Sequence, residues 1–118
     1  MKRILVAEDE QVIREFEVIN LKRAGYDVFE AENGEQALKI YDREGGNFDV
    51  AVLDIMMPGE YDGLAVCREL RKRSNTIGII MLSAKTQEMD KVSGLMTVSY
   101  THLVITNFLK HVSRTRKR

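Results

Sequence analysis

The sequence predicts an α/β domain in which a five-stranded parallel β-sheet carries helices on both faces. Two observations lead to this fold class: short apolar runs alternate with amphipathic stretches along the chain, and turn-forming residues such as glycine separate many of them. This alternation is typical of parallel strands joined by right-handed helical crossovers. A length of 118 residues suits one domain with one core. We therefore expect a doubly wound sheet.

Five segments are predicted to be strands because they are short and apolar or rich in β-forming residues. They are residues 4–7, 26–31, 48–53, 77–82 and 102–106. The first is apolar throughout, as expected of a strand that is buried on both faces. The sequence thus supplies all the strands of the predicted sheet.

Helices are predicted between these strands and after the last one. They cover residues 9 or 10 to 24, 33–41, 64–73, 86–96 and 108–113. In the first helix, the apolar stripe that should face the sheet consists of Ile13, Phe16, Ile19 and Leu21. Gly25 should end this helix in the left-handed conformation. The last fifth of the chain fits the pattern least well.

Composition limits the classes of protein to consider. About 44% apolar and 31% charged residues are ordinary for a soluble domain. No apolar run approaches the roughly 18 residues of a membrane span, so we expect no membrane association. The single cysteine, Cys67, cannot form an internal disulfide, which favours a cytoplasmic location. Its spacing indicates a core residue.

The net charge of zero conceals a basic C-terminal stretch. Residues 98–118 contain five basic and no acidic side chains. Such a basic end can mark a nucleic-acid-binding arm. We interpret residues 114–118 instead as a basic tail or the start of a linker, because no aromatic residues are interleaved with these charges. We therefore expect no nucleic acid to be bound by this chain itself.

Acidic residues follow two of the predicted strands. Glu8 and Asp9 follow the first, and Asp54 follows the third. In a sheet ordered 2-1-3-4-5 these strands are neighbours, and their C-terminal ends flank the switch point where open α/β sheets bind ligands. Oxygen ligands without His or Cys favour Mg²⁺ or Mn²⁺. The sequence predicts a metal site with Asp54 as a nucleophile toward a phosphoryl group.

Ser83 follows the fourth strand, where its hydroxyl can bond a phosphoryl oxygen at the same sheet edge. Each signal has a structural alternative. Ser83 would cap the next helix, Glu8 and Asp9 would complement a helix dipole in its first turn, and Asp54 would be a turn residue. The joint placement at three strand ends favours a functional site.

The motifs resemble the receiver domain of two-component response regulators. The resemblance is carried by residues 4–10 (ILVAEDE), 52–58 (VLDIMMP) with Asp62 and Gly63, and 81–85 (MLSAK). It covers residues 1 to about 97 and implies a flavodoxin-like receiver domain over residues 1–113. Residues 98–118, which include the end of this domain and the basic tail, are atypical of the family. Asp62 and Gly63 themselves are interpreted as turn residues ahead of a helix.

The resemblance also implies a function. Asp54 would accept a phosphoryl group from a histidine kinase, and Ser83 would sense it. Glu8, Asp9, Asp54 and the Met56 backbone carbonyl would hold Mg²⁺, with Mn²⁺ as the alternative ion. The chain would be a phosphoacceptor that assists its own phosphorylation and dephosphorylation rather than an enzyme. Further implied partners are an output domain or protein beyond the C-terminus, often DNA-binding, and a second copy in a homodimer.

The sequence departs from the family pattern in the loop after Asp54. Three residues, Gly59, Glu60 and Tyr61, separate the loop proline from the Asp-Gly pair, where the family usually has two. One additional loop residue adds little closure entropy, so we expect only local rearrangement.

The second departure concerns the family's Lys-Pro pair, because the only proline of the chain is Pro58. Depending on the register, Leu103 or Ile105 takes the lysine position, and Tyr100 or His102 the aromatic switch position. Losing a positioned cation costs on the order of a few kcal/mol of transition-state stabilisation. The alternative function is therefore a pseudo-receiver that binds partners but is phosphorylated poorly or not at all.

A third class, the haloacid dehalogenase type of phosphatase, also uses an aspartate at a strand end. It requires a second acid two residues after the nucleophile, and this position is Met56 here. The sequence therefore disfavours a phosphatase.

Overall fold

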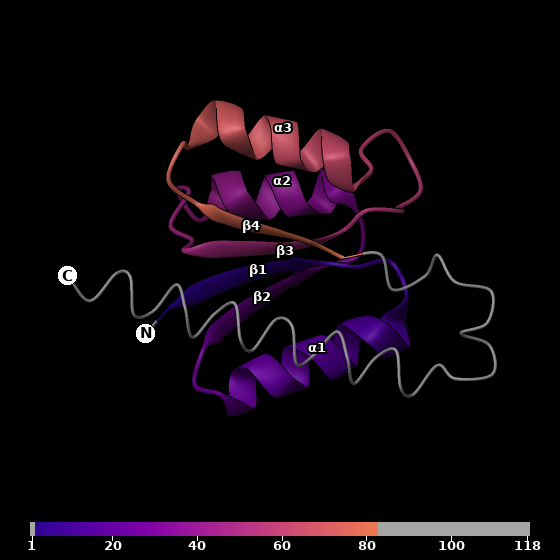
Figure 1. Cartoon of the computed structure of the whole chain (residues 1–118), viewed down its shortest axis with the longest axis vertical. Coiled ribbons are helices and arrows are strands. Elements are labelled where there is room, and N and C mark those ends of the chain that lie inside the picture. Colours follow the sequence, from indigo (N-terminus) through magenta and orange to yellow (C-terminus); the bar gives the residue numbers. More distant parts are fainter. Residues whose placement is uncertain (1, 83–118) are drawn as a thin grey trace. The chain divides into compact units, whose positions relative to one another are not determined.

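Parallel strands alternate with helices in the computed structural model, which describes residues 2–82 (Figure 1). The elements are β1 (Arg3–Ala7), α1 (Gln11–Arg23), β2 (Asp27–Ala31), α2 (Gly34–Arg43), β3 (Val50–Asp54), α3 (Gly63–Arg73) and β4 (Gly78–Leu82). The predicted alternation is confirmed over this range. The helices predicted at 86–96 and 108–113 and the strand at 102–106 lie outside the described residues, as do Ser83, Tyr100, His102, Leu103 and Ile105.

The sheet has the order β2-β1-β3-β4, and every pair of neighbouring strands is parallel. Ala7 at the end of β1 lies opposite Ala31 of β2 on one side and Leu53 of β3 on the other. The residues that follow β1 and the end of β3 therefore meet at one edge of the sheet. This is the predicted order for the four strands that the structure describes.

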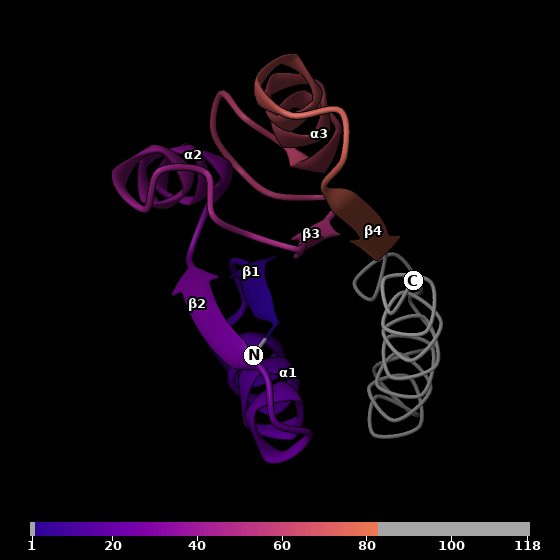
Figure 2. The same ribbon diagram turned by 90° about the vertical axis from the view of Figure 1, so that its left-hand side faces the viewer.

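Helices cover both faces of the sheet. Figure 2 shows α1 on one face and α2 with α3 on the other, and α1 contacts β1 and β2 while α2 and α3 contact each other. β3 is buried along its whole length; it lies between β1 and β4 and contacts α3. Cys67 of α3 packs against this core, as predicted.

Side chains and glycines fix the ends of the helices. Gly25 follows α1 with a φ of +96°, the left-handed conformation predicted from the sequence. Asn33 caps α2 by accepting a hydrogen bond from the Gln36 N–H at 2.8 Å. Asp62 caps α3 in the same way, with the Ala65 N–H at 2.9 Å. The interpretation of Asp62 as a turn residue ahead of a helix is confirmed.

The predicted buried stripe of α1 is partly wrong. Leu21 is buried as expected, but Ile19 is 49% exposed, and Arg14 and Glu17 are buried instead. The inner face is therefore rotated by about one residue from the face that apolar spacing indicates. Arg14 faces inward, where it hydrogen-bonds the Glu8 carbonyl and the Glu30 side chain.

Candidate functional site

Three carboxylates meet at the C-terminal edge of the sheet. Asp54 is the last residue of β3, and Glu8 and Asp9 come directly after β1. One oxygen of each carboxylate lies within 4.8 Å of the corresponding oxygens of the other two. Glu8 and Asp54 are only 1% and 2% exposed, and Asp9 is partly buried. The structure thus brings together the three acidic side chains that the sequence predicted to form a site.

The turn after β1 holds Glu8 by its main chain and its side chain. The Glu8 N–H donates to the Ala31 carbonyl at 3.1 Å, and the Glu8 carbonyl accepts from Arg14 Nη1 at 2.8 Å. Oε2 of Glu8 accepts a hydrogen bond from the Glu10 N–H at 3.1 Å. α1 begins only at Gln11, so Glu8 and Asp9 do not lie in its first turn. The helix-dipole alternative therefore does not explain them.

The loop after β3 is fixed next to Asp54. The Ile55 N–H donates to the Leu82 carbonyl at 2.8 Å, and the Gly63 N–H donates to the Ile55 carbonyl at 3.0 Å. Gly63 approaches the Asp54 main chain so closely that a Cβ atom on it would collide with the Asp54 carbonyl oxygen. Gly63 therefore helps to set the path of the chain directly after Asp54.

The electrostatics of the site disfavour several negative charges in the absence of a cation. Burial raises the pKa of Asp54 to about 7; the charge of Glu8 also raises it, whereas the Met56 N–H, 3.4 Å from Oδ1, lowers it. A hydrogen bond with the Glu8 side chain raises the pKa further. Asp54 is therefore only partly ionised near neutral pH unless a cation compensates the pocket.

A fourth carboxyl group, Glu17, belongs to the same electrostatic neighbourhood. It projects from the inner face of α1, is only 3% exposed, and its Oε2 has no hydrogen-bond partner within residues 2–82. Burial raises the pKa of Glu17 to about 8, and the charges of Glu8 and Asp54 add to this effect. Glu17 thus adds a fourth carboxyl group to the acidic neighbourhood of Glu8 and Asp54.

The donor set suits a hard divalent cation. Carboxylate oxygens are the ligands that Mg²⁺ and Mn²⁺ prefer, and Mg²⁺ commonly uses one or two carboxylates with water and a phosphoryl oxygen. A dication would also offset the repulsion that raises the pKa of Asp54. Glu8, Asp9 and Asp54 thus fit such an ion by chemistry and spacing. The Met56 carbonyl stays a predicted ligand.

Three residues near this site were not predicted from the sequence. Gly63 was assigned only to a turn, although its closeness to Asp54 depends on the absence of a side chain. Arg14 and Glu17 are three residues apart on α1 and therefore share one face of the helix. The prediction followed the spacing of the apolar residues alone and so missed this charged inner face.

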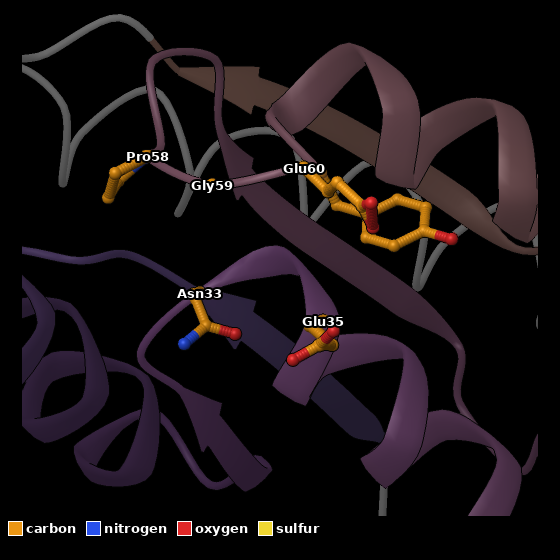
Figure 3. A pocket seen from close by; sticks show the side chains of 6 residues that line it. Asn33, Glu35, Pro58, Gly59 and Glu60 are labelled. Atoms are coloured by element: carbon orange, nitrogen blue, oxygen red, sulfur yellow. The ribbon is translucent and has the colours of Figure 1, made fainter.

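A separate cavity of about 280 Å³ lies between the start of α2 and the loop after β3. Figure 3 shows Asn33 and Glu35 across from Pro58, Gly59 and Glu60. Its lining includes the three-residue segment that lengthens this loop, and none of the three clustered acids. The longer loop therefore shapes the surface beside α2, while Asp62 still caps α3.

Comparison with known proteins identifies the family. Residues 4–104 match the family model of the response regulator receiver domain. The chain belongs to this family. The match extends a few residues beyond Thr97, the point at which the motif resemblance was expected to end. As a receiver domain, it functions in two-component signal transduction.

Relatives of this receiver domain include regulators of transcription. The alkaline phosphatase synthesis transcriptional regulatory protein PhoP of Bacillus subtilis is 47% identical over 94 residues, which are 80% of this chain and 38% of PhoP. A probable transcriptional regulatory protein of Picosynechococcus is 48% identical over 98 residues, 79% of this chain and 39% of that protein. The chain thus spans less than two fifths of the length of these relatives.

Solved structures give the same family assignment. The response regulator TrrA of Thermotoga maritima, in complex with Mg²⁺-BeF, is 48% identical, has a TM-score of 0.65, and aligns over 73% of this chain and 72% of its own. TrrA in complex with the histidine kinase ThkA is 46% identical with a TM-score of 0.65, over 75% and 73% of the two chains. No helix within residues 2–82 is long and apolar enough to cross a membrane.

Proposed function

We propose that this receiver domain accepts a phosphoryl group on Asp54 from a histidine kinase, with Mg²⁺ bound by Glu8, Asp9 and Asp54. The convergence of these three carboxylates at the end of β1 and β3 carries the proposal. The relationship to TrrA supports both parts, because that regulator is known in complex with Mg²⁺-BeF and with a kinase. Mn²⁺ would be an alternative ion.

Asp54 would act as the nucleophile. One of its carboxylate oxygens attacks the phosphorus atom of phosphohistidine, the bond between phosphorus and the imidazole nitrogen breaks, and the imidazole keeps the electron pair. Asp54 must be ionised for this step, and burial together with the charge of Glu8 raises its pKa to about 7, which disfavours ionisation. A bound Mg²⁺ would offset this cost and neutralise charge on the phosphoryl oxygens.

The chain's other residues would position the reacting carboxylate and exclude water. Gly63 holds the chain after Asp54, and the Met56 N–H hydrogen-bonds its Oδ1. Asp54 itself is only 2% exposed, so the surrounding residues exclude most solvent from its carboxylate. By resemblance, Ser83 would bond a phosphoryl oxygen and report its presence to partner surfaces.

Exposed apolar side chains support docking of a protein partner near this edge. Val12 and Ile19 lie on α1, seven residues and two turns apart, and are 78% and 49% exposed. Met56, two residues after Asp54, is 59% exposed. Apolar side chains of this kind favour a protein contact, and the histidine kinase is the partner that must reach Asp54. An output domain outside this chain and a homodimer remain part of the proposal.

Incubation with a small phosphodonor and Mg²⁺, followed by intact-mass measurement, tests this function. We expect the mass of one phosphoryl group on the wild type, and none after Asp54→Asn or after chelation of Mg²⁺. Asp62→Asn is the matched control, because Asn retains the helix cap and should leave phosphorylation intact. Absence of any mass gain from several donors would contradict the proposal.

A pseudo-receiver is the second candidate, because the sequence has no Lys-Pro pair. Such a domain would bind partners without phosphorylation of Asp54. Mg²⁺ binding combined with an unchanged mass in the same experiment would favour this candidate over the first.

A further inference from the structure

The inner face of α1 carries a cation next to the acidic site. Arg14 is only 9% exposed, and its guanidinium spans two neighbouring elements. Nη1 donates to the Glu8 carbonyl oxygen at 2.8 Å, and Nε donates to Oε1 of Glu30 on β2 at 3.2 Å. Arg14 thus connects α1, the end of β1 and β2 through one rigid, planar group.

The bond from Arg14 completes a frame around Glu8. The Glu8 N–H is held by the Ala31 carbonyl on β2, and one oxygen of its side chain is held by the Glu10 N–H. Arg14 holds the carbonyl on the other side of the same residue. The direction in which the Glu8 carboxylate projects is therefore determined on both sides of its Cα atom.

Arg14 can affect metal binding in two opposing ways, through its charge and through the orientation of Glu8. A guanidinium beside an acidic pocket repels a dication, so removing it would strengthen binding if electrostatics dominated. If orientation of Glu8 dominates, removing Arg14 weakens binding, because Mg²⁺ demands near-ideal octahedral geometry. The two effects can be distinguished by the sign of the change in affinity.

We propose that Arg14 is a positioning residue for the metal site, and that its hydrogen bond to the Glu8 carbonyl sets the geometry of the Glu8 ligand for Mg²⁺. The inference rests on the proposed function, since it assumes that Glu8, Asp9 and Asp54 bind this ion. Arg14 itself does not contact the ion; its effect passes through Glu8. Loss of such an outer partner typically weakens metal affinity by about 10- to 100-fold.

Titration of Mg²⁺ and Ca²⁺ into the wild type, Arg14→Met, Arg14→Lys and Glu30→Gln tests this role, with calorimetry or NMR shifts as the readout. Arg14→Met keeps the apolar stem without the donors, and we expect Mg²⁺ affinity to fall at least tenfold. Arg14→Lys should recover part of the loss. Ca²⁺ affinity should fall less, because Ca²⁺ tolerates irregular geometry.

Glu30→Gln is the matched control, because it removes the ion pair of Arg14 but leaves the bond to Glu8 available. We expect its Mg²⁺ affinity to stay within about threefold of the wild type. Unfolding of each variant by urea separates stability from binding. If Arg14→Met does not fold, Arg14→Lys must show a several-fold loss for Mg²⁺ that exceeds its loss for Ca²⁺.

Two results would overturn the inference. Tighter binding of both ions by Arg14→Met would show that charge repulsion dominates. Unchanged Mg²⁺ affinity with a lower free energy of unfolding would show that Arg14 only stabilises the fold. A wild type that binds no Mg²⁺ would instead refute the proposed metal site, and the positioning role with it.

Discussion

Glu17→Gln should stabilise the receiver domain increasingly as the pH rises. The substitution keeps the size of a side chain that is 3% exposed and removes its ability to ionise. Burial, with the charges of Glu8 and Asp54, raises the pKa of Glu17 from 4.5 to about 8 in the folded chain. Between pH 4.5 and about pH 8, Glu17 is therefore protonated in the folded chain and ionised in the unfolded chain.

The sign and size of the effect follow from this difference. Tighter proton binding by Glu17 in the folded chain contributes fully to the free energy of unfolding below pH 4.5. This contribution falls as the pH rises and is lost above about pH 8. At about 1.4 kcal/mol per pKa unit, wild type should lose roughly 3 kcal/mol relative to Glu17→Gln between pH 5 and pH 8. Saturating Mg²⁺ should reduce this difference, because it offsets the charges of Glu8 and Asp54.

Urea unfolding at pH 5, 6, 7 and 8 measures the difference, with Glu15→Gln on the exposed side of the same helix as the control. We expect the free energy of unfolding of Glu15→Gln to follow that of the wild type over the whole range. A constant difference between Glu17→Gln and the wild type would refute the reasoning, since Glu17 would then not change its protonation on folding.

Further predictions concern the residues around Asp54. Gly63→Ala should destabilise the fold by roughly 1–3 kcal/mol and weaken Mg²⁺ binding, because its Cβ collides with the Asp54 main chain; urea unfolding and metal titration measure both, and wild-type values would contradict the packing argument. Asp62→Ala should cost about 1 kcal/mol through loss of the α3 cap, whereas Asp62→Asn should cost little. Mg²⁺ affinity should fall as the pH drops below about 7, because a proton competes for Asp54; titrations at pH 5.5 and 8 measure it, and equal affinities would mean that Asp54 is already ionised.

Much of the fold could be predicted because buried parallel strands are short apolar runs, and runs of this length bounded by turn residues are too short to be buried helices. β1 and β4 differ by one residue at their starts from the predicted strands, and the acids after β1 and at the end of β3 were placed at the same edge. Asn33 and Gly25 marked helix ends because their backbone chemistry is local. Such features depend on a few neighbouring residues, so the sequence displays them directly.

The inner face of α1 could not be predicted because tertiary contacts determine it. Apolar spacing placed Ile19 inside, but the hydrogen bonds of Arg14 to Glu8 and Glu30 turn the charged side of the helix toward the sheet. The raised pKa of Glu17 depends on burial and on the charges of Glu8 and Asp54. These residues come together only after strands that are distant in the sequence have paired. The close approach of Gly63 to the Asp54 main chain likewise could not be predicted from neighbouring residues, because it depends on the path of the folded loop.

The central claim is that Asp54 is the residue that becomes phosphorylated. Borohydride reduces an aspartyl phosphate to homoserine, so treatment after incubation with a phosphodonor and Mg²⁺ marks the modified residue for peptide sequencing by mass spectrometry. We predict homoserine at position 54, dependent on Mg²⁺ and on the donor. Homoserine at another aspartate, or unmodified Asp54 in a chain that binds Mg²⁺, would contradict the account.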